Sequence, residues 1–275
     1  MKEGTARPAP GSAGTAISYG FILLCLGLLV LPACTDPARE RFEASEKALL
    51  EQKMETALSG YRSIPKEFPQ SRYAPTALLR QGELFGAYYR NYPAALEAYE
   101  SLVFNYPRAA EAPQAILHQG EIHLLHFLDY AAAAEDLEAI RRRHPRFARM
   151  DEVLLLLAKA YAGASDPARE FAALSELVEK FPESSRAAEG RWMLAYALLA
   201  QGKFLEADRE FRKLYYLAAD RKAIARARWG MAQSLEGLGQ LSAAVEQYEA
   251  IRNDWDDPAY VAEKIARLKR RMNAK

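Results

Sequence analysis

Apolar residues recur along the chain in trios whose members lie four and then three positions apart. In an α-helix this spacing puts the three side chains on one stripe, so each trio predicts an amphipathic helix. The trios follow one another at intervals of 37 or 38 residues, five beginning with alanine and one with glutamate: Ala57, Tyr61, Ile64; Ala95, Tyr99, Leu102; Ala133, Leu137, Ile140; Glu170, Leu174, Leu177; Ala207, Phe211, Leu214; Ala244, Tyr248, Ile251. The chain therefore repeats one helical face six times.

The end of most of these predicted helices is marked as well. An aromatic residue or histidine followed by proline comes four residues after each of the first four trios: Phe68-Pro69, Tyr106-Pro107, His144-Pro145 and Phe181-Pro182. Proline lacks an amide donor and disfavours helical geometry in the residue before it, so it ends the helix. In the later copies a preceding helix is legible too, and Gly202 and Gly239 follow it where a left-handed residue should end one helix before the next begins. The repeat unit is therefore a helical hairpin.

An all-α fold also agrees with a composition rich in Ala, Leu, Glu and Arg, side chains that lose little rotamer freedom in helices. The hairpin, with its small, aromatic and terminal-proline positions, resembles the tetratricopeptide repeat, with the usual period of about 34 residues lengthened. We expect an α-solenoid of period 37–38 over residues 39–258, closed by a polar-faced capping helix and basic tail over residues 259–275. Two copies contain one residue more between Gly82 or Gly120 and the following Ala95 or Ala133, so their local geometry should differ.

The first 33 residues resemble a bacterial lipoprotein signal peptide. After a polar start, an uncharged run extends from Ile17 to Leu31 and is shorter than the roughly 20 residues that a membrane-spanning helix needs. The run ends in Leu31-Pro32-Ala33-Cys34, which resembles a lipobox and implies cleavage before Cys34, lipidation of that cysteine and a lipidated linker over residues 34–38. Thr35 stands where aspartate would resemble an inner-membrane retention signal, which favours the periplasmic face of the outer membrane. Two alternatives stay open: an uncleaved anchor, and cleavage near Ala33 that leaves Cys34 free.

Charge and cysteine content argue against several classes of protein. The formal net charge of +1 falls to 0 once a leader carrying Lys2, Glu3 and Arg7 is removed, so no concentrated positive charge favours nucleic acid. The only two cysteines, Cys25 and Cys34, lie in or beside the apolar run and suit neither a disulfide-stapled domain nor a zinc site. We expect no nucleic acid, cofactor, metal or small-molecule substrate.

In a solenoid of this kind the first helix of each hairpin lines the concave face, so groove positions can be counted from its small residue. This count predicts a partner-binding groove lined by Leu79, Arg80, Glu83, Leu117, His118, Glu121, Leu155, Lys159, Trp192, Tyr196, Trp229 and Gln233. Trp and Tyr favour binding because each buries much area with few rotatable bonds. The alternative that Trp192 and Trp229, 37 residues apart, only pack on each other stays open. The groove lacks the Lys and Asn pair by which some cytosolic relatives of the repeat hold a C-terminal carboxylate.

No residue pattern indicates catalysis: the chain has no Gly-rich phosphate loop, nucleophile elbow or Cys-His pair. His123 and His126 lie one helical turn apart near Glu121, but without a third convergent ligand they indicate packing rather than a metal site. Two basic stretches, Arg141-Arg142-Arg143-His144 and Lys264 to Lys275, suit solvated helix ends, where cations complement the helix dipole. Docking to acidic partners or anionic lipid is the alternative for both stretches.

A lipobox followed by hairpins that end in Phe-Pro or Tyr-Pro resembles the BamD-like family, lipoproteins of the outer-membrane β-barrel assembly machinery. The same repeat type is similar to Tol-Pal and cell-division coordinators and to pilus-assembly lipoproteins. The resemblance implies a lipid-anchored periplasmic scaffold, not an enzyme, whose partners are envelope proteins or extended peptide segments. An accessory of a cell-wall hydrolase would need a loop insertion for which the near-constant period leaves no room. A cytosol-facing adaptor would need an uncleaved N-terminal segment.

Overall fold

The computed structural model describes residue 1, residue 4 and residues 36–274, so Cys34 and the rest of the lipobox lie outside the described residues. Over residues 36–274 every regular element is helical: α2 (Pro37–Leu50), α3 (Met54–Glu67), α4 (Tyr73–Glu83), η1 (Leu84–Tyr88), α5 (Tyr92–Asn105), α6 (Ala112–Ile122), η2 (His123–Phe127), α7 (Tyr130–Arg143), α8 (Met150–Gly163), α9 (Pro167–Lys180), α10 (Ser185–Ala200), α11 (Phe204–Leu217), α12 (Arg221–Gly237), α13 (Leu241–Ile251) and α14 (Pro258–Asn273). None of these helices is long and apolar enough to cross a membrane. The predicted all-α solenoid is confirmed.

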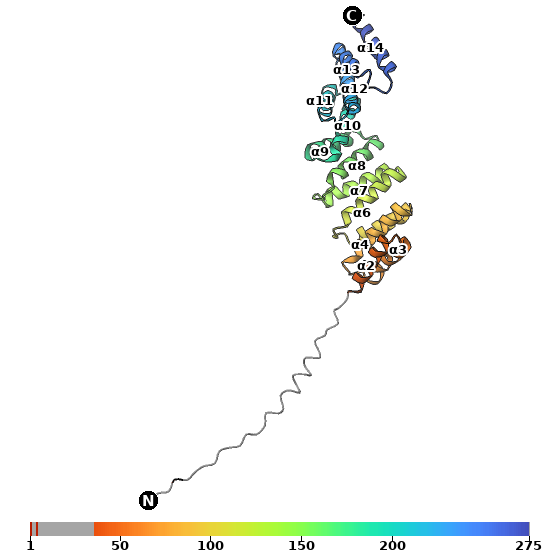
Figure 1. Ribbon diagram of the computed structural model, residues 1–275, viewed down its shortest axis with the longest axis vertical. Coiled ribbons are helices and arrows are strands. Elements are labelled where there is room, and N and C mark those ends of the chain that lie inside the picture. Colours follow the sequence, from red (N-terminus) through yellow and green to blue (C-terminus); the bar gives the residue numbers. More distant parts are fainter. Residues whose placement is uncertain (2–3, 5–35, 275) are drawn as a thin grey trace.

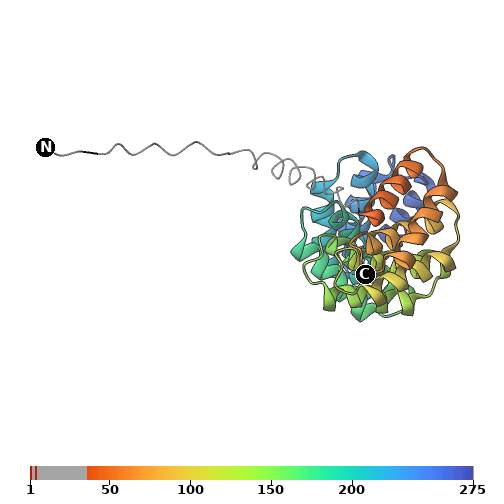
Figure 2. The same cartoon turned by 90° about the horizontal axis from the view of Figure 1, so that it is seen from below.

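The helices pair into hairpins that stack along one axis, from α2–α3 at one end to α14 at the other (Figure 1). We number the hairpins 1 to 6, from α2–α3 to α12–α13. The first helices of successive hairpins contact one another, from α2 with α4 through to α10 with α12. Seen along the long axis, the hairpins wind round a ring (Figure 2). The first helices therefore lie on the inner side of a superhelix.

The repeated stripe forms the core of this array. Every trio member predicted from the sequence is buried except Glu170, which is half-buried. Close packing against the stripe also explains two glycines of the first helices, because a Cβ on Gly82 would lie 2.2 Å from the Tyr99 ring and one on Gly230 would lie 2.3 Å from the Phe211 ring. The aromatic side chain of a second helix thus packs directly against the backbone of a first helix. This contact determines how closely the two helices approach.

A left-handed residue ends the first helix of every hairpin. Gly202 and Gly239 have φ of +73° and +74°, as predicted. The other four hairpins use non-glycine residues at the equivalent position: Gln52, Arg90, Leu128 and Ser165, with φ between +51° and +59°. An L-residue pays roughly 1–2 kcal/mol in this conformation. The turn geometry is therefore a property of the stacked repeat, and glycine is not required to form it.

The extra residue in hairpins 2 and 3 is accommodated by a π-helix. The first helices of these two hairpins, α4 and α6, continue as the π-helical segments η1 and η2. A π-turn takes one more residue than an α-turn, which keeps Ala95 and Ala133 in register with the other trios. Both insertions fall at the C-terminal end of the first helix, in two neighbouring hairpins.

A proline inside α3 leaves one backbone carbonyl oxygen in the core without its helical hydrogen bond. Pro65 has no amide hydrogen, so it cannot donate to the carbonyl oxygen of Tyr61 four residues earlier. The Gln81 side chain, from α4 of the next hairpin, donates Nε2–H to that oxygen at 3.2 Å. Gln81 is only 7% exposed. One buried glutamine therefore replaces the missing helical hydrogen bond and joins hairpin 1 to hairpin 2.

Candidate partner-binding surface

The three leucines predicted to line the groove are in the core. Leu79, Leu117 and Leu155 are 5%, 0% and 4% exposed, so their assignment to a binding surface is wrong. They stand one turn before Gly82 and its equivalents, at the edge of the buried stripe. An aliphatic chain at this edge turns toward the neighbouring helices because burial of its apolar surface is favourable.

The polar groove residues predicted in hairpins 2 and 3 are bound by other side chains of the chain. Arg80 of α4 donates to Glu46 of α2 at 3.1 Å and to Glu83 at 2.8 Å. Glu83 in turn accepts from Gln114 of α6 at 3.3 Å. His118 pairs with Glu121 at 2.7 Å. These contacts join α2 to α4 and α4 to α6 across the inner face.

Similar polar contacts join α8 to α10. Lys159, also predicted in the groove, forms an ion pair with Glu189 at 2.8 Å. Arg186 of α10 reaches Glu152 of α8 at 2.6 Å, and Arg149 reaches the same carboxylate at 2.7 Å. Desolvation opposes ionisation of Glu152, but these two arginines outweigh it and lower the pKa of the carboxyl group. The polar part of the inner face is therefore largely occupied by contacts within the chain.

Aromatic side chains form an open hollow between α10 and α12. Trp192 and Tyr196 stack with ring centroids 6.2 Å apart, and both contact Phe211, at 6.1 and 5.2 Å. The Arg226 guanidinium lies over Trp192 at 4.8 Å from the ring centroid. The hollow measures about 800 Å³ and is also lined by Glu170, Ser185, Ala188, Glu189, Met193, Ala197 and Ala200. Tyr196 is 37% exposed, so an aromatic surface is available to a partner here.

Trp229 is covered by the C-terminal cap. Its ring stacks on Trp255 at 4.5 Å, meets Tyr248 at 4.9 Å and lies 5.8 Å from Tyr260 of α14. Among residues 36–274 the rings of Trp192 and Trp229 make no contact with each other. The described structure therefore does not show the alternative in which these two tryptophans pack together. Trp229 thus belongs to the capping core, and half-buried Gln233 follows it one turn later on α12.

The histidines considered for metal binding make separate contacts. His123 pairs with Asp136 at 2.7 Å, and burial raises the pKa of that aspartate even though the histidine lowers it. His126 stacks on Tyr92 with ring centroids 3.7 Å apart. Within residues 36–274 no group of three His, Cys, Asp or Glu side chains is placed to hold a metal ion.

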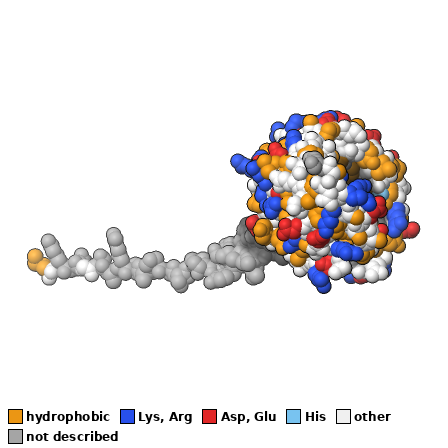
Figure 3. Space-filling view, turned by 90° about the horizontal axis from the view of Figure 1, so that it is seen from above, with side chains coloured by type: hydrophobic (Ala, Val, Ile, Leu, Met, Phe, Trp, Pro, Cys, Tyr) orange, Lys and Arg blue, Asp and Glu red, His pale blue; other side chains and the backbone are white. Residues whose placement is uncertain are grey.

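Both basic stretches are partly paired with acidic side chains of the chain. Arg141 reaches Glu138 at 2.7 Å and Glu176 of α9 at 2.6 Å. In the tail, Lys264 pairs with Glu236 at 3.0 Å and Lys269 with Glu249 at 2.7 Å. The view onto the C-terminal end shows acidic and basic side chains interspersed over the surface (Figure 3).

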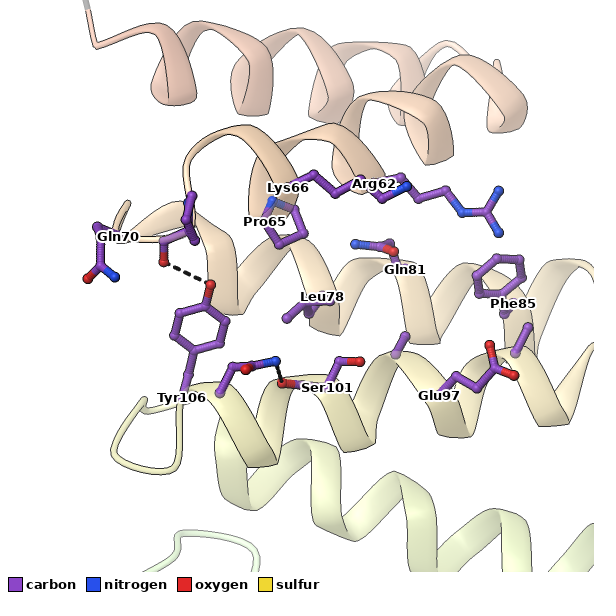
Figure 4. A pocket seen from close by; sticks show the side chains of 14 residues that line it. Arg62, Pro65, Lys66, Gln70, Leu78, Gln81, Phe85, Glu97, Ser101 and Tyr106 are labelled. Carbon is purple, nitrogen blue, oxygen red and sulfur yellow. Dashed lines mark hydrogen bonds between the residues drawn. The ribbon is translucent and has the colours of Figure 1, made fainter.

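A cleft that the sequence did not predict opens between α3 and α5 (Figure 4). It measures about 740 Å³, with Arg62 and Lys66 on one wall and Glu97 and Ser101 on the other. Tyr106 donates from its hydroxyl to the carbonyl oxygen of Pro69 at 2.8 Å and closes one end.

The corresponding cleft between α7 and α9 is smaller, about 360 Å³. There Arg141 and Glu176 form an ion pair across the gap. The positions equivalent to this pair in the α3–α5 cleft hold Pro65 and Ser101, which are too short to meet. The width of each cleft therefore depends on which side chains occupy two positions of the repeat.

Comparison with known proteins places the chain in a family. The family model described as "YfiO: Outer membrane lipoprotein" matches residues 112–269, more than half of the 275 residues. The chain belongs to the YfiO outer membrane lipoprotein family. The YfiO-family match begins at the first residue of α6 and runs into α14, so it contains the aromatic hollow and leaves out hairpins 1 and 2. No curated protein matches the chain.

Solved structures similar to this YfiO-family chain include tetratricopeptide proteins. The protein YrrB, described as having an unusual peptide-binding site, has a TM-score of 0.60 and 15% identity over 75% of this chain and 97% of its own. A tetratricopeptide protein from Parabacteroides merdae has 0.55 and 15% over 84% and 86%. PilW, described as a type IV pilus biogenesis factor, has 0.52 and 15% over 82% and 98%. At these identities the likeness establishes the fold.

Proposed function

We propose that this protein is a lipid-anchored scaffold on the periplasmic face of the outer membrane, without enzymatic activity, that serves β-barrel assembly as BamD-like lipoproteins do. Membership of an outer membrane lipoprotein family supports the anchor, and the Leu31-Pro32-Ala33-Cys34 sequence supplies a cysteine for it. The single observation that carries the binding role is the open aromatic hollow between α10 and α12. Its occupant on this proposal is an extended segment of an envelope protein.

The hollow suits a protein segment for two physical reasons. Trp and Tyr dominate binding hot spots, and here Trp192 and Tyr196 are held in place by Phe211 before any partner arrives. Preorganised side chains lose little entropy on binding. The Arg226 guanidinium, with no carboxylate within 4.0 Å among the described residues, offers charged donors at the rim.

Crosslinking in cells tests the binding role. A photo-crosslinking residue at Tyr196 should capture a partner, whereas the same residue at Tyr216, 81% exposed on α11, should not. Trp192→Ala should weaken association by about 2 kcal/mol or more, roughly thirtyfold, as for a buried hot-spot aromatic. Capture of β-barrel precursors or assembly proteins supports the proposal. Capture of division or pilus proteins would assign the protein to another envelope system, and equal capture from both positions would refute the groove.

Lipidation is tested independently of binding. Cys34→Ala should abolish acyl labelling, and an inhibitor of lipoprotein signal peptidase should make the wild-type precursor accumulate. Two or more acyl chains would make attachment stable, since each buried methylene contributes about 0.8 kcal/mol. A variant that labels and fractionates like the wild type would refute the anchor.

A further inference from the structure

The cleft between α3 and α5 contains two cations without an ionic partner in the described chain. Arg62 and Lys66 lie one turn apart on the α3 wall (Figure 4), and neither forms an ion pair within 4.0 Å among residues 36–274. The Arg62 guanidinium is held 4.9 Å from the ring centroid of Phe85, which also lines the cleft. Like charges at this spacing destabilise a helix. A ligand that supplies an anionic group would therefore stabilise this wall.

The carboxylates near these two cations do not pair with them. Glu97, on the α5 wall, is the one carboxylate in the lining of this cleft within the described residues. Glu55 and Glu67 line a separate hollow on the far side of the same cations, and Glu67 is bound there by Arg41. The cleft lining thus has two cations against one carboxylate.

The α7–α9 cleft shows which group fits opposite such a basic wall. There Glu176 of α9 occupies the position equivalent to Ser101, and it pairs with Arg141 across the cleft at 2.6 Å. Glu138 occupies the position equivalent to Arg62 and also pairs with Arg141, at 2.7 Å. The α3–α5 cleft has cations on its α3 wall but lacks both of these carboxylates. A partner can therefore supply from outside the group that Glu176 supplies from within the chain.

The other lining groups suit a protein segment better than a free inorganic anion. Leu78 adds apolar surface. Gln81 also lines the cleft, and its Nε2 is bound to the Tyr61 carbonyl oxygen, whereas its Oε1 accepts from no described residue. This oxygen is accessible, because the fully buried side-chain atoms without a partner in the described chain are Tyr89 Oη and Asp208 Oδ1. An open acceptor near two cations favours a ligand that carries an N–H donor as well as a carboxylate, and a peptide has both.

We propose that the α3–α5 cleft binds an extended segment of a partner protein in which an acidic residue stands between apolar ones. The carboxylate faces Arg62 and Lys66, a backbone N–H donates to Gln81 Oε1, and an apolar neighbour contacts Leu78. A cleft of about 740 Å³ accommodates a few residues of such a segment. This site goes beyond the proposed function, because every residue that lines it precedes the YfiO-family match and none belongs to the aromatic hollow.

The test is fluorescence anisotropy with the full-length protein in detergent and two labelled, end-capped peptides, Ser-Leu-Asp-Leu-Ser and Ser-Leu-Asn-Leu-Ser. The aspartate peptide should bind about fivefold more tightly, as expected of an exposed ion pair, and added salt should reduce this preference. Arg62→Gln and Lys66→Gln should each weaken binding of the aspartate peptide about two- to fivefold. Arg142→Gln is the matched control, because Arg142 is the exposed equivalent of Lys66 in hairpin 3 and should not contribute.

A substitution on the opposite wall gives the sharpest result. Ser101→Glu places a carboxylate where the α7–α9 cleft has Glu176, so it should abolish the preference for the aspartate peptide, whereas Ser101→Gln, of the same size without the charge, should keep it. Circular dichroism of each variant establishes that a loss of binding is not a loss of fold.

Several outcomes would overturn the proposal. They are no binding of the aspartate peptide, equal binding of both peptides, and the same effect of glutamate and glutamine at position 101. Loss of the preference in Trp192→Ala would move the peptide to the aromatic hollow. Displacement by inorganic phosphate, but not by sodium chloride of equal ionic strength, would assign the cleft to phosphate groups. Partner capture from Tyr196 in cells does not depend on these outcomes, so the two sites fail separately.

Discussion

Replacing Gln81 by methionine should destabilise the junction between hairpins 1 and 2. Methionine keeps the volume of the glutamine but removes the donor that satisfies the Tyr61 carbonyl oxygen. An unsatisfied buried acceptor costs about 1–3 kcal/mol. For an array of this size, that loss corresponds to a fall in Tm of roughly 2–12 °C if unfolding is cooperative.

The cause can be isolated with a second substitution. Pro65→Ala restores an amide hydrogen four residues after Tyr61, so the helix itself can satisfy the carbonyl. In the Pro65→Ala background, Gln81→Met should therefore cost less than about 0.5 kcal/mol, and the difference is the coupling energy. Gln119→Met is the matched control: Gln119 is equivalent and 8% exposed, but valine, not proline, stands at position 103.

Hydrogen exchange is the suitable assay because an end hairpin can open separately from the rest of a repeat array. Protection of the α3 amides should fall about tenfold for each 1.4 kcal/mol lost in Gln81→Met, while amides of α9 keep theirs. Urea unfolding followed by circular dichroism gives the global value. Equal losses with and without Pro65→Ala would show that the hydrogen bond to Tyr61 does not explain the buried glutamine.

Three further predictions can be checked by urea unfolding. Ser165→Gly should raise the free energy of unfolding by up to about 1 kcal/mol, because glycine adopts the left-handed conformation without strain. Gly202→Ala should lower the free energy of unfolding by about 1–2 kcal/mol, because alanine does not. A change of the same sign in both variants would refute the argument about the turn. Gly82→Ala should cost about 1–3 kcal/mol because its Cβ meets the Tyr99 ring, whereas Gly86→Ala, whose nearest contact is 3.8 Å away, should cost less than about 0.5 kcal/mol. The pKa of Glu152 is lowered on folding. The stability that ionised Glu152 contributes is therefore present above the unfolded pKa of 4.5 and is lost as the pH falls through the folded pKa. The wild type should lose more stability on acidification than the Glu152→Gln variant does.

The architecture could be predicted from the sequence because the information for it is local. The four-and-three spacing defines the buried stripe, and α3, α5, α7 and α9 each end before the Phe-, Tyr- or His-Pro pair as predicted. The boundaries moved by small amounts: α2 begins at Pro37, within the predicted linker, and α14 at Pro258. Asp36 and Asp257 cap those two helices, and aspartate is a strong N-cap residue.

The binding surface was predicted less well because burial depends on the side chain as well as on the position. Counting from the small residue assigned Leu155 and Trp192 to equivalent places, yet the leucine is buried and the tryptophan is only partly so. The extra residue of hairpins 2 and 3 was visible in the spacing, but a loop or a π-helix could have absorbed it. Arg226, the partner of Trp192, could not be identified because it lies on the next hairpin and the sequence does not show how hairpins are rotated.

The inner face therefore differs between its two ends for a physical reason. Ion pairs and hydrogen bonds tie α2 to α4, α4 to α6 and α8 to α10, and a partner would have to replace contacts already made there. Between α10 and α12 the described residues form no ion pair, and the Arg226 guanidinium of α12 lies over the Trp192 ring of α10. A cation–π contact at an exposed site contributes about 0.5–1 kcal/mol. A partner that supplies a carboxylate to Arg226 and apolar surface to Trp192 therefore loses little free energy by displacing this cation–π contact. For this reason the Trp192 hollow is the part of the inner face where a partner can most easily replace a contact within the chain.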